Sequence, residues 1–245
     1  LPFQAIGYKK ALQAAKEHPH YQAPLGPGQG RGLASAFWIN SGQQSSATIN
    51  IALDGAINVL TGNPDIGGSR ASMALLAAEV FGVPVETVHP TVADTDSVGY
   101  CDGTGGSRTT LATGGAVIQA AEKLVLELRH RAAAIWGVDL DEVEWVDGKA
   151  GARTTGDLEN LMDAGAAVQL ENREMSLVEL AETSGATGGP LSAVASLHAH
   201  NSAPAFAINI CDAAVDRETG KVDITRFTCI QDAGKAVHPA YVEGQ

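Results

Sequence analysis

The tetrapeptide Gly-Gly-Ser-Arg occurs twice in this chain, at Gly67–Arg70 and at Gly105–Arg108. Each copy follows turn-forming residues and precedes a segment with helical periodicity. Paired glycines permit a tight turn, and serine is a favoured first residue at a helix start. Because the first N–H groups of a helix have no partner within it, such a start can bind an anion. The repeat therefore predicts two helix starts that together hold an anionic group such as a pyrophosphate.

A simpler interpretation is that both copies are ordinary helix starts whose arginines point into solvent. Short motifs of this kind occur in many unrelated proteins. The repetition strengthens the anion-site hypothesis, but the residues by themselves leave both interpretations open.

Apolar residues at helical spacing follow both copies. After the first copy, Met73, Leu76 and Val80 lie on one stripe, and Gly82 is a typical helix end. After the second copy, the pattern extends through residues 117–135 and predicts the longest helix of the chain.

Alternating apolar residues predict strands elsewhere in the chain. Residues 49–53 and 57–59 flank Asp54-Gly55, a strong signal for a β-hairpin. Further strands are expected at residues 33–40, 85–92, 206–210 and 222–224, with a small hairpin at 145–150. Strands and helices mix without regular alternation, so the expected fold class is α+β, with layered mixed sheets and helices.

The first thirty residues are expected to form a short helix and a linker, and residues 31–245 a larger domain. The Pro- and Gly-rich stretch 18–32 reads as the linker, because its glycine spacing fits no nucleotide-binding loop. The chain starts at Leu1 and stops at Gln245 within a pattern. We therefore expect a piece of a longer protein, with the larger domain incomplete at its C-terminus.

The composition excludes several classes of partner. A net charge of −12 argues against binding nucleic acid or an anionic membrane. Cys101, Cys211 and Cys229 show no Cys-x-x-Cys spacing, so we expect neither disulfides nor a zinc or iron–sulfur site. No apolar run approaches the length that spans a membrane. A cytoplasmic protein is expected.

Three other groups of residues could carry chemistry. His198 and His200 would lie on one face of a strand, but no third metal ligand is evident, which favours a structural role. Asp94 and Asp96 are typical of a turn rather than of an acid–base pair. Cys101 lies near the second copy, which could activate its thiol. We predict no catalytic residue and no metal ligand within this chain.

Several short motifs occur in a fixed order between Arg31 and Gln245. In sequence they are Asp54-Gly55, Asp65–Gly68, Asp94-Thr95, Gly106–Thr109, Gly115–Val117, Thr219-Gly220, Asp232–Gly234 and Gly244-Gln245. Their order and spacing resemble the molybdopterin-binding large subunit of the xanthine dehydrogenase/aldehyde oxidase family, the molybdenum hydroxylases. The resemblance covers nearly the whole chain and implies the α+β fold of that family.

The resemblance implies an oxidoreductase that hydroxylates a C–H carbon of an aldehyde or an N-heteroaromatic compound, with oxygen taken from water. It implies molybdenum held by molybdopterin in its cytosine dinucleotide form. It implies iron–sulfur clusters and FAD on partner subunits or domains. It also implies a set of cofactor-binding residues, namely Gly67, Gly68, Ser69, Gly105, Gly106, Ser107, Arg108, Thr109 and Gln245.

Two departures from the family pattern bear on function. Gly68 stands where the family often has a glutamine that reaches toward the metal. The family's catalytic glutamate lies beyond Gln245, so the chain alone is expected to be inactive. Two alternatives from other classes stay open: a cofactor-free structural or assembly domain, and a nucleotide-binding module that acts alone.

Overall fold

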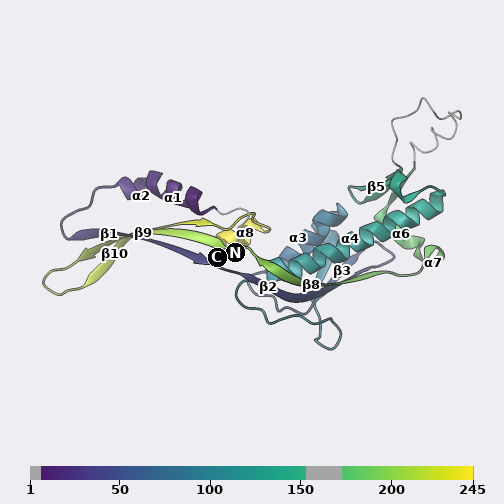
Figure 1. Cartoon of the computed structure of the whole chain (residues 1–245), viewed down its shortest axis with the longest axis horizontal. Coiled ribbons are helices and arrows are strands. Elements are labelled where there is room, and N and C mark those ends of the chain that lie inside the picture. The colour runs from purple at the N-terminus through teal and green to yellow at the C-terminus, as the bar shows by residue number, and fades with distance from the viewer. Residues whose placement is uncertain (1–6, 153–172, 245) are drawn as a thin grey trace, which may run out of the picture. The chain divides into compact units, whose positions relative to one another are not determined.

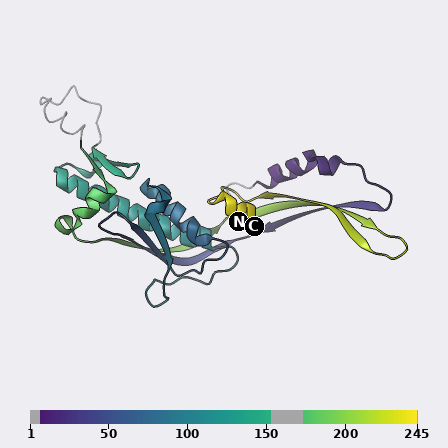
Figure 2. The same cartoon turned by 180° about the vertical axis from the view of Figure 1, so that it is seen from behind.

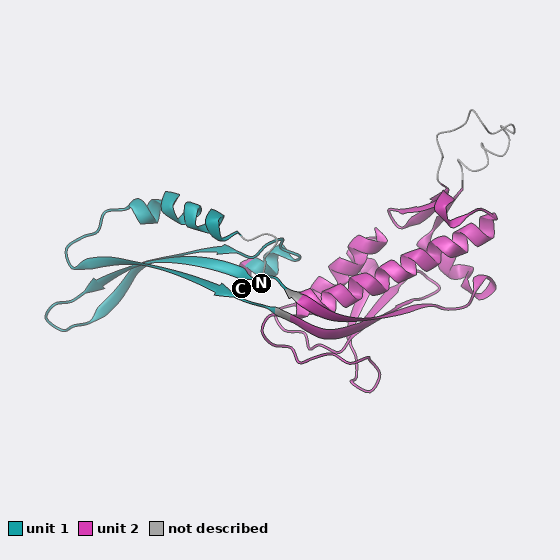
Figure 3. Ribbon diagram, in the orientation of Figure 1, with its two compact units in different colours: residues 1–41, 201–242 teal, residues 42–200, 243–245 magenta. Residues whose placement is uncertain are grey.

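The computed structural model describes residues 7–152 and 173–244, and the chain divides into two compact units (Figure 3). Unit 1 comprises Leu1–Ser41 with Asn201–Val242, and unit 2 comprises Gly42–His200 with Glu243–Gln245. The expected boundary after residue 30 lies within unit 1. A single larger domain over residues 31–245 stays a prediction.

Unit 1 is built on a three-stranded antiparallel sheet with β9 (Ala205–Val215) in the centre. β1 (Gln29–Trp38) and β10 (Val222–Asp232) pair with its two edges, and the predicted meander of β9 and β10 is confirmed. Helix α1 (Tyr8–Glu17) lies along this sheet, and its continuation α2 is Pro19–Gln22 (Figure 1).

The linker predicted at residues 18–32 is wrong in part. His18 precedes α2, and its ring nitrogen Nδ1 accepts the backbone N–H of His20, which supports a helical turn that begins at Pro19. β1 begins at Gln29, four residues before the predicted strand, because Gln29–Gly32 pair with β9 despite their glycines.

A buried ion pair joins the start of unit 1 to its sheet. Arg31 donates two hydrogen bonds to the carboxylate of Asp212, each 2.7 Å long, and a third group, His20 Nε2, lies 3.1 Å from the same carboxylate. The other guanidinium nitrogen of Arg31 donates to the carbonyl oxygens of Tyr21 and Ala23. One arginine thus fixes the α2 segment against β1 and β9.

Unit 2 is organised around a four-stranded mixed sheet of order β4-β3-β2-β8. β2 (Ser41–Ile51) and β3 (Ile57–Thr61) form the predicted hairpin, and β4 (Val88–Val92) pairs parallel to β3. β8 (Leu191–Ser202) is the other edge strand. Parallel and antiparallel pairs therefore occur in one sheet, in keeping with the predicted α+β class.

Two helices cover one face of this sheet, α3 (Ser69–Phe81) and α4 (Thr109–Trp136) (Figures 1 and 2). Both predicted helices are confirmed, and α3 ends at Gly82, whose φ of 67° places it in the left-handed region favoured by glycine. Helices and sheet share one apolar core, whose fully buried members include Ile49, Ile57, Val59, Phe81, Leu124 and Leu128.

The remaining elements are short. They are η1 (Val85–Thr87), η2 (Leu140–Glu142), β5 (Val143–Val146), β6 (Lys149–Ala152), β7 (Glu174–Ser176), α6 (Leu177–Glu182), α7 (Ser184–Thr187) and α8 (Pro239–Gly244). β5, β6 and β7 form a third sheet that contains the predicted hairpin. No helix in the described ranges is long and apolar enough to cross a membrane.

The first prediction concerns the pH dependence of folding. The hydrogen bonds from Arg31, followed by the contact with His20, lower the pKa of Asp212 to about 2, against an opposing effect of burial. Because the unfolded carboxyl has a pKa of about 3.9, the stabilising contribution of Asp212 is complete above about pH 5 and is lost as the pH falls through about 2. Asp212→Asn is therefore expected to make the free energy of unfolding depend less on pH in that window.

Asp223→Asn is the matched control for this measurement. Asp223 lies on the same sheet and pairs with Lys221 at 2.8 Å, but both side chains are exposed, and exposed pairs contribute little to stability. Urea unfolding between pH 2.5 and pH 6 decides the matter. An unchanged pH dependence in Asp212→Asn would contradict the prediction.

Candidate functional site

The two tetrapeptide copies lie at the same end of unit 2. Near the start of α4, a Cβ atom on Gly114 would be 2.7 Å from Leu76 of α3, with Met73 next to it. At the other end of α3, the carbonyl oxygen of its last residue, Phe81, accepts the indole N–H of Trp145, in the strand that follows α4. The two helices therefore run alongside each other in the same direction, with adjacent N-termini.

A buried asparagine connects the loops that carry the two copies. The side-chain amide of Asn63 donates to the Thr104 hydroxyl at 2.9 Å and, more weakly, to the carbonyl oxygen of Asp102. Its oxygen accepts the hydroxyl of Thr113 at 2.6 Å, and that hydroxyl also lies 2.9 Å from the hydroxyl of Ser45. The two loops are thereby held side by side. No local pattern marks Asn63 for this role, because its partners are 39 to 50 residues away in the sequence.

Identical residues adopt different conformations in the two copies. In the first copy, Gly67 and Gly68 have φ of 62° and 76°, whereas in the second copy Gly106 and Ser107 have φ of 63° and 61°. The left-handed pair is thus shifted by one position. The residue that precedes the helix is Gly68 in one copy and Arg108 in the other, so the prediction that serine caps both helices is wrong.

The N-terminus of α3 already holds a carboxylate from its own loop. Asp65 accepts the backbone N–H of Arg70 at 3.0 Å and its Nε at 3.2 Å. The Arg70 side chain is half exposed. Asp65, which is itself paired with Arg70, thus occupies a donor of this helix end, so the end of α3 is a less favourable place for a phosphate than an end whose donors are free.

The N-terminus of α4 is open by comparison. The side chain of Arg108, the residue before α4, makes no capping hydrogen bond, and the first turn of the helix contains no acidic residue. Gly105, Gly106 and Ser107 are exposed, and a Cβ atom on either glycine would meet nothing within 4 Å. The hydroxyl of Thr109 is buried without a hydrogen-bond partner in the described structure. This end has room for an anionic ligand, and the first turn of the helix offers N–H donors to it.

Arg108 points into the interior, although the tetrapeptide predicted an arginine that faces an anion. Its side chain is 1% exposed. Nε donates to the carbonyl oxygen of Gly42 at 2.9 Å, and Nη1 donates to that of Asp102 at 2.8 Å. Nη2 donates to the carbonyl oxygen of Gln44 and to the hydroxyl of Ser45. Every nitrogen of the guanidinium group therefore has a partner within unit 2.

Asp102 brings a negative charge close to this arginine. Its carboxylate accepts the backbone N–H of Gln44 at 2.8 Å and the hydroxyl of Tyr100 at 2.9 Å. The N–H of Gln44, then Tyr100, and then the nearby charge of Arg108 hold the pKa of Asp102 below its ordinary value. Asp102 is therefore ionised at neutral pH, and its loop is fastened to the start of β2.

The other candidate residues form no catalytic arrangement among the described residues. His198 and His200 have ring centroids 4.1 Å apart, but the described residues contain no group of three or more possible metal ligands. Asp94 accepts the backbone N–H of Asp96 at 2.8 Å, as expected of a turn.

The remaining two candidate residues are Cys101 and Gln245. The sulfur of Cys101 lies 3.4 Å from the backbone nitrogen of Ser46 on β2, so the thiol lies against the sheet. Gln245, predicted to contact the cofactor, lies outside the described residues.

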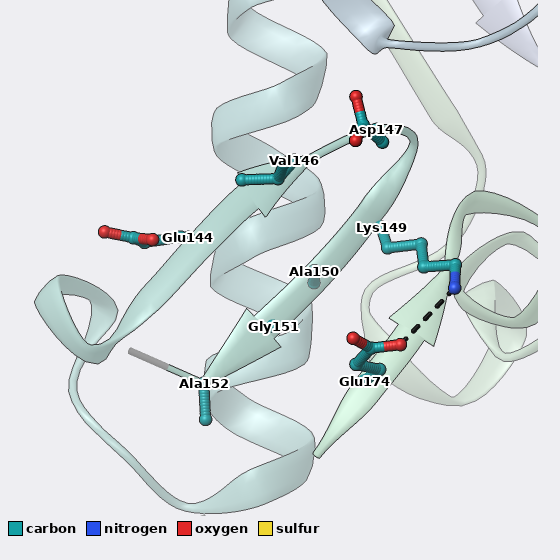
Figure 4. A pocket seen from close by; sticks show the side chains of 8 residues that line it. All are labelled: Glu144, Val146, Asp147, Lys149, Ala150, Gly151, Ala152 and Glu174. Carbon is teal, nitrogen blue, oxygen red and sulfur yellow. Dashed lines mark hydrogen bonds and ion pairs between the residues drawn. The ribbon is translucent and has the colours of Figure 1, made fainter. Parts of the chain in front are cut away.

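A cavity of about 300 Å³ lies along the third sheet, far from either copy in sequence (Figure 4). It is lined by residues of β5, β6 and β7 and of the β5–β6 turn, and two of the lining residues, Lys149 and Glu174, form an ion pair at 3.3 Å. It contains none of the predicted site residues. The candidate site is instead the exposed surface around the start of α4.

Comparison with known proteins decides the family. The family model described as "Molybdopterin cofactor-binding domain" matches residues 4–245. The chain belongs to this family. The predicted resemblance to the molybdopterin-binding part of molybdenum hydroxylases is confirmed.

Curated relatives of this family member are much longer than the chain. It is 27% identical to the carbon monoxide dehydrogenase large chain of Hydrogenophaga pseudoflava over 184 residues, which is 73% of this chain and 21% of that protein. It is 28% identical to the probable hypoxanthine oxidase XdhD of Escherichia coli K12 over 226 residues, or 88% of this chain and 21% of that protein. The chain thus spans about a fifth of the length of these relatives.

Solved structures confirm the fold. Quinoline 2-oxidoreductase from Pseudomonas putida 86 aligns with a TM-score of 0.71 at 20% identity, over 96% of this chain and 30% of that one. The Cu,Mo-CO dehydrogenase aligns with a TM-score of 0.75 at 23% identity, over 88% of this chain and 28% of that one. The α+β fold of the molybdopterin-binding type, predicted from the sequence, is therefore correct.

The second prediction tests the connection between the two loops. Asn63→Ala removes the amide that joins them and leaves buried polar partners short of a hydrogen bond, so we expect a loss of about 1–3 kcal/mol in the free energy of unfolding. Asn58→Ala, on the neighbouring strand, is the control, because its side chain has no hydrogen bond within the described part of the chain. Equal effects of the two substitutions in urea unfolding would show that the connection is unimportant.

Proposed function

We propose that this chain is the cofactor-holding part of a molybdenum hydroxylase, and that the start of α4 binds the phosphate-bearing end of the cofactor. The observation that most supports the proposal is the open N-terminus of α4 within a chain that matches the family over residues 4–245. When bound, molybdopterin would supply the metal centre at which a C–H carbon is hydroxylated.

The residues at the start of α4 fit an anionic group. The backbone N–H groups of Gly105, of Ser107 and of the first helical turn are the proposed donors, and the unpartnered hydroxyl of Thr109 is a further one. The helix end adds about 0.3–1 kcal/mol for a nearby negative charge, and up to about 2 kcal/mol where the charge is partly buried. Together these groups would hold and orient a phosphate without a positively charged side chain at the surface.

The first copy, Gly67–Arg70, is proposed to contact a different part of the cofactor. Because Asp65 occupies the end of α3, we assign Gly67, Gly68 and Ser69 to an uncharged part of the cofactor, where glycine allows close approach of the backbone. A pyrophosphate that spans both helix ends, as the repeat suggested, is less favourable beside that carboxylate. Gly68 leaves no amide side chain to reach a metal from this loop.

The finer features of the enzyme belong to the same proposal. We propose the cytosine dinucleotide form of the cofactor, iron–sulfur and FAD partners, and a cytoplasmic location. Names among the relatives range from nicotine 6-hydroxylase to aldehyde oxidoreductase, so we propose only an aldehyde or an N-heteroaromatic compound as the substrate class.

The isolated chain is proposed to be inactive. The family match does not favour a cofactor-free structural domain or a separate nucleotide-binding module.

Analysis of the whole protein that contains this chain tests the proposal. Molybdenum, pterin and cytidine nucleotide released by acid are expected in equal amounts, close to one of each per chain. Protein made in cells that have a complete cofactor pathway but carrying neither molybdenum nor pterin would overturn it. Pterin without cytidine would overturn only the dinucleotide form.

The third prediction concerns the turn before α4. Gly106 has a φ of 63°, which a β-branched residue adopts only at a cost of about 1–3 kcal/mol, so Gly106→Val should distort the turn and lower cofactor content several-fold. Gly103→Val is a matched control in the same loop, because Gly103 has no positive φ and no atom lies within 4 Å of its would-be Cβ. Equal cofactor contents in both variants, measured on folded protein, would contradict the proposed role of the turn.

A further inference from the structure

Arg108 is the largest fully buried side chain among the described residues. Burying a cation is unfavourable unless hydrogen bonds satisfy its donors. Arg108 makes no ion pair of salt-bridge length in the described structure, and its partners are three carbonyl oxygens and one hydroxyl. A residue placed at such a cost is expected to perform a task that an apolar side chain could not.

The partners of Arg108 come from two segments that are far apart in the sequence. Gly42, Gln44 and Ser45 belong to the start of β2, and Asp102 belongs to the loop that leads to α4. The flat guanidinium group reaches all of them at once, since its donors point in several directions in one plane. No single ammonium group could do so.

The same two segments are joined a second time by two hydrogen bonds between Gln44 and Asp102. Gln44 donates its N–H to the carboxylate of Asp102, and the N–H of Asp102 donates to the carbonyl oxygen of Gln44 at 3.0 Å. The stretch from Asp102 to Arg108 is thus held at both of its ends against β2. The exposed turn Gly105–Ser107 is the part of the stretch between these two attachments.

The turn contains a strained residue that needs such support. Ser107 has a φ of 61°, a conformation that costs a residue with a side chain free energy and persists only where the surroundings enforce it. The next residue, Arg108, is fastened inside the unit by the hydrogen bonds described above. The matching arginine of the first copy, Arg70, is half exposed, and within the described ranges its side chain bonds only to Asp65 of its own loop.

We propose that Arg108 is a positioning residue, which holds the Gly105–Ser107 turn in its anion-binding shape before any ligand arrives, and that it does not contact the anion itself. This inference rests on the proposed function of the α4 terminus. It predicts that the shape of the loop depends on the guanidinium group even when no cofactor is present.

Hydrogen exchange in the cofactor-free whole protein tests the inference directly. The amides of Gln44 and Asp102 report the attachment, because each is hydrogen-bonded across it. In Arg108→Met we expect both amides to exchange at least tenfold faster, with core amides of β3 unchanged. Arg70→Met is the matched control and should leave all of these rates as in the wild type. Unchanged exchange in Arg108→Met would overturn the inference.

Cofactor retention in the loaded protein separates positioning from direct binding. Arg108→Lys keeps the positive charge but cannot reach four acceptors, so we expect it to lose cofactor on dialysis at least tenfold faster than wild type, as Arg108→Met does. Retention at the wild-type level in Arg108→Lys would overturn positioning by the guanidinium group. Arg70→Met should retain its cofactor.

Two further measurements keep the test decisive. If Arg108→Met does not fold, Ser45→Ala removes one partner of Nη2 and should speed exchange of the same two amides by a smaller factor; no change would count against the inference. Absence of pterin from the wild-type protein would refute the proposed function. The exchange measurement in cofactor-free protein would still decide whether Arg108 shapes the loop.

Discussion

The hydrogen bonds of one buried guanidinium group determine the shape of the candidate site. Arg108 connects the first residues of β2 to the loop before α4, and Asn63 then connects that loop to the one before α3. The exposed turn Gly105–Ser107 belongs to this connected structure. Its backbone N–H groups are therefore held in place by interactions within the interior, although the turn itself lies at the surface.

Features that depend on neighbouring residues could be predicted from the sequence. Asp54-Gly55 forms the expected hairpin because the turn needs only local chemistry, and Gly82 ends α3 because glycine readily adopts a positive φ. The two helices after the tetrapeptides followed from apolar periodicity. The order of the short motifs identified the family, since it reflects the whole length of the chain.

Features that depend on distant partners could not be predicted in this way. The acceptors of Arg108 on β2 are 63 to 66 residues away in the sequence, so its tetrapeptide gives no sign that the side chain is buried. The ion pair of Arg31 with Asp212 joins residues 181 positions apart. It holds the segment 18–32, where a linker was expected, against the sheet. Serine failed to cap α3 and α4 because the turn before each helix places the left-handed residues differently.

The two copies differ in how a nearby carboxylate is used. One carboxylate occupies a donor of its helix end, and the other leaves the helix end free for a ligand. At α3 the loop supplies its own carboxylate, Asp65, which pairs with Arg70 and accepts one N–H of the helix end. At α4 the nearby carboxylate of Asp102 is directed toward β2 and is balanced by Arg108, so the helix end keeps its donors. A turn that is already ordered loses little conformational entropy on binding, and a ligand bound there stabilises the folded form in turn. The interactions that hold Arg108 inside unit 2 are therefore also the ones that would make the start of α4 a strong site for a phosphate.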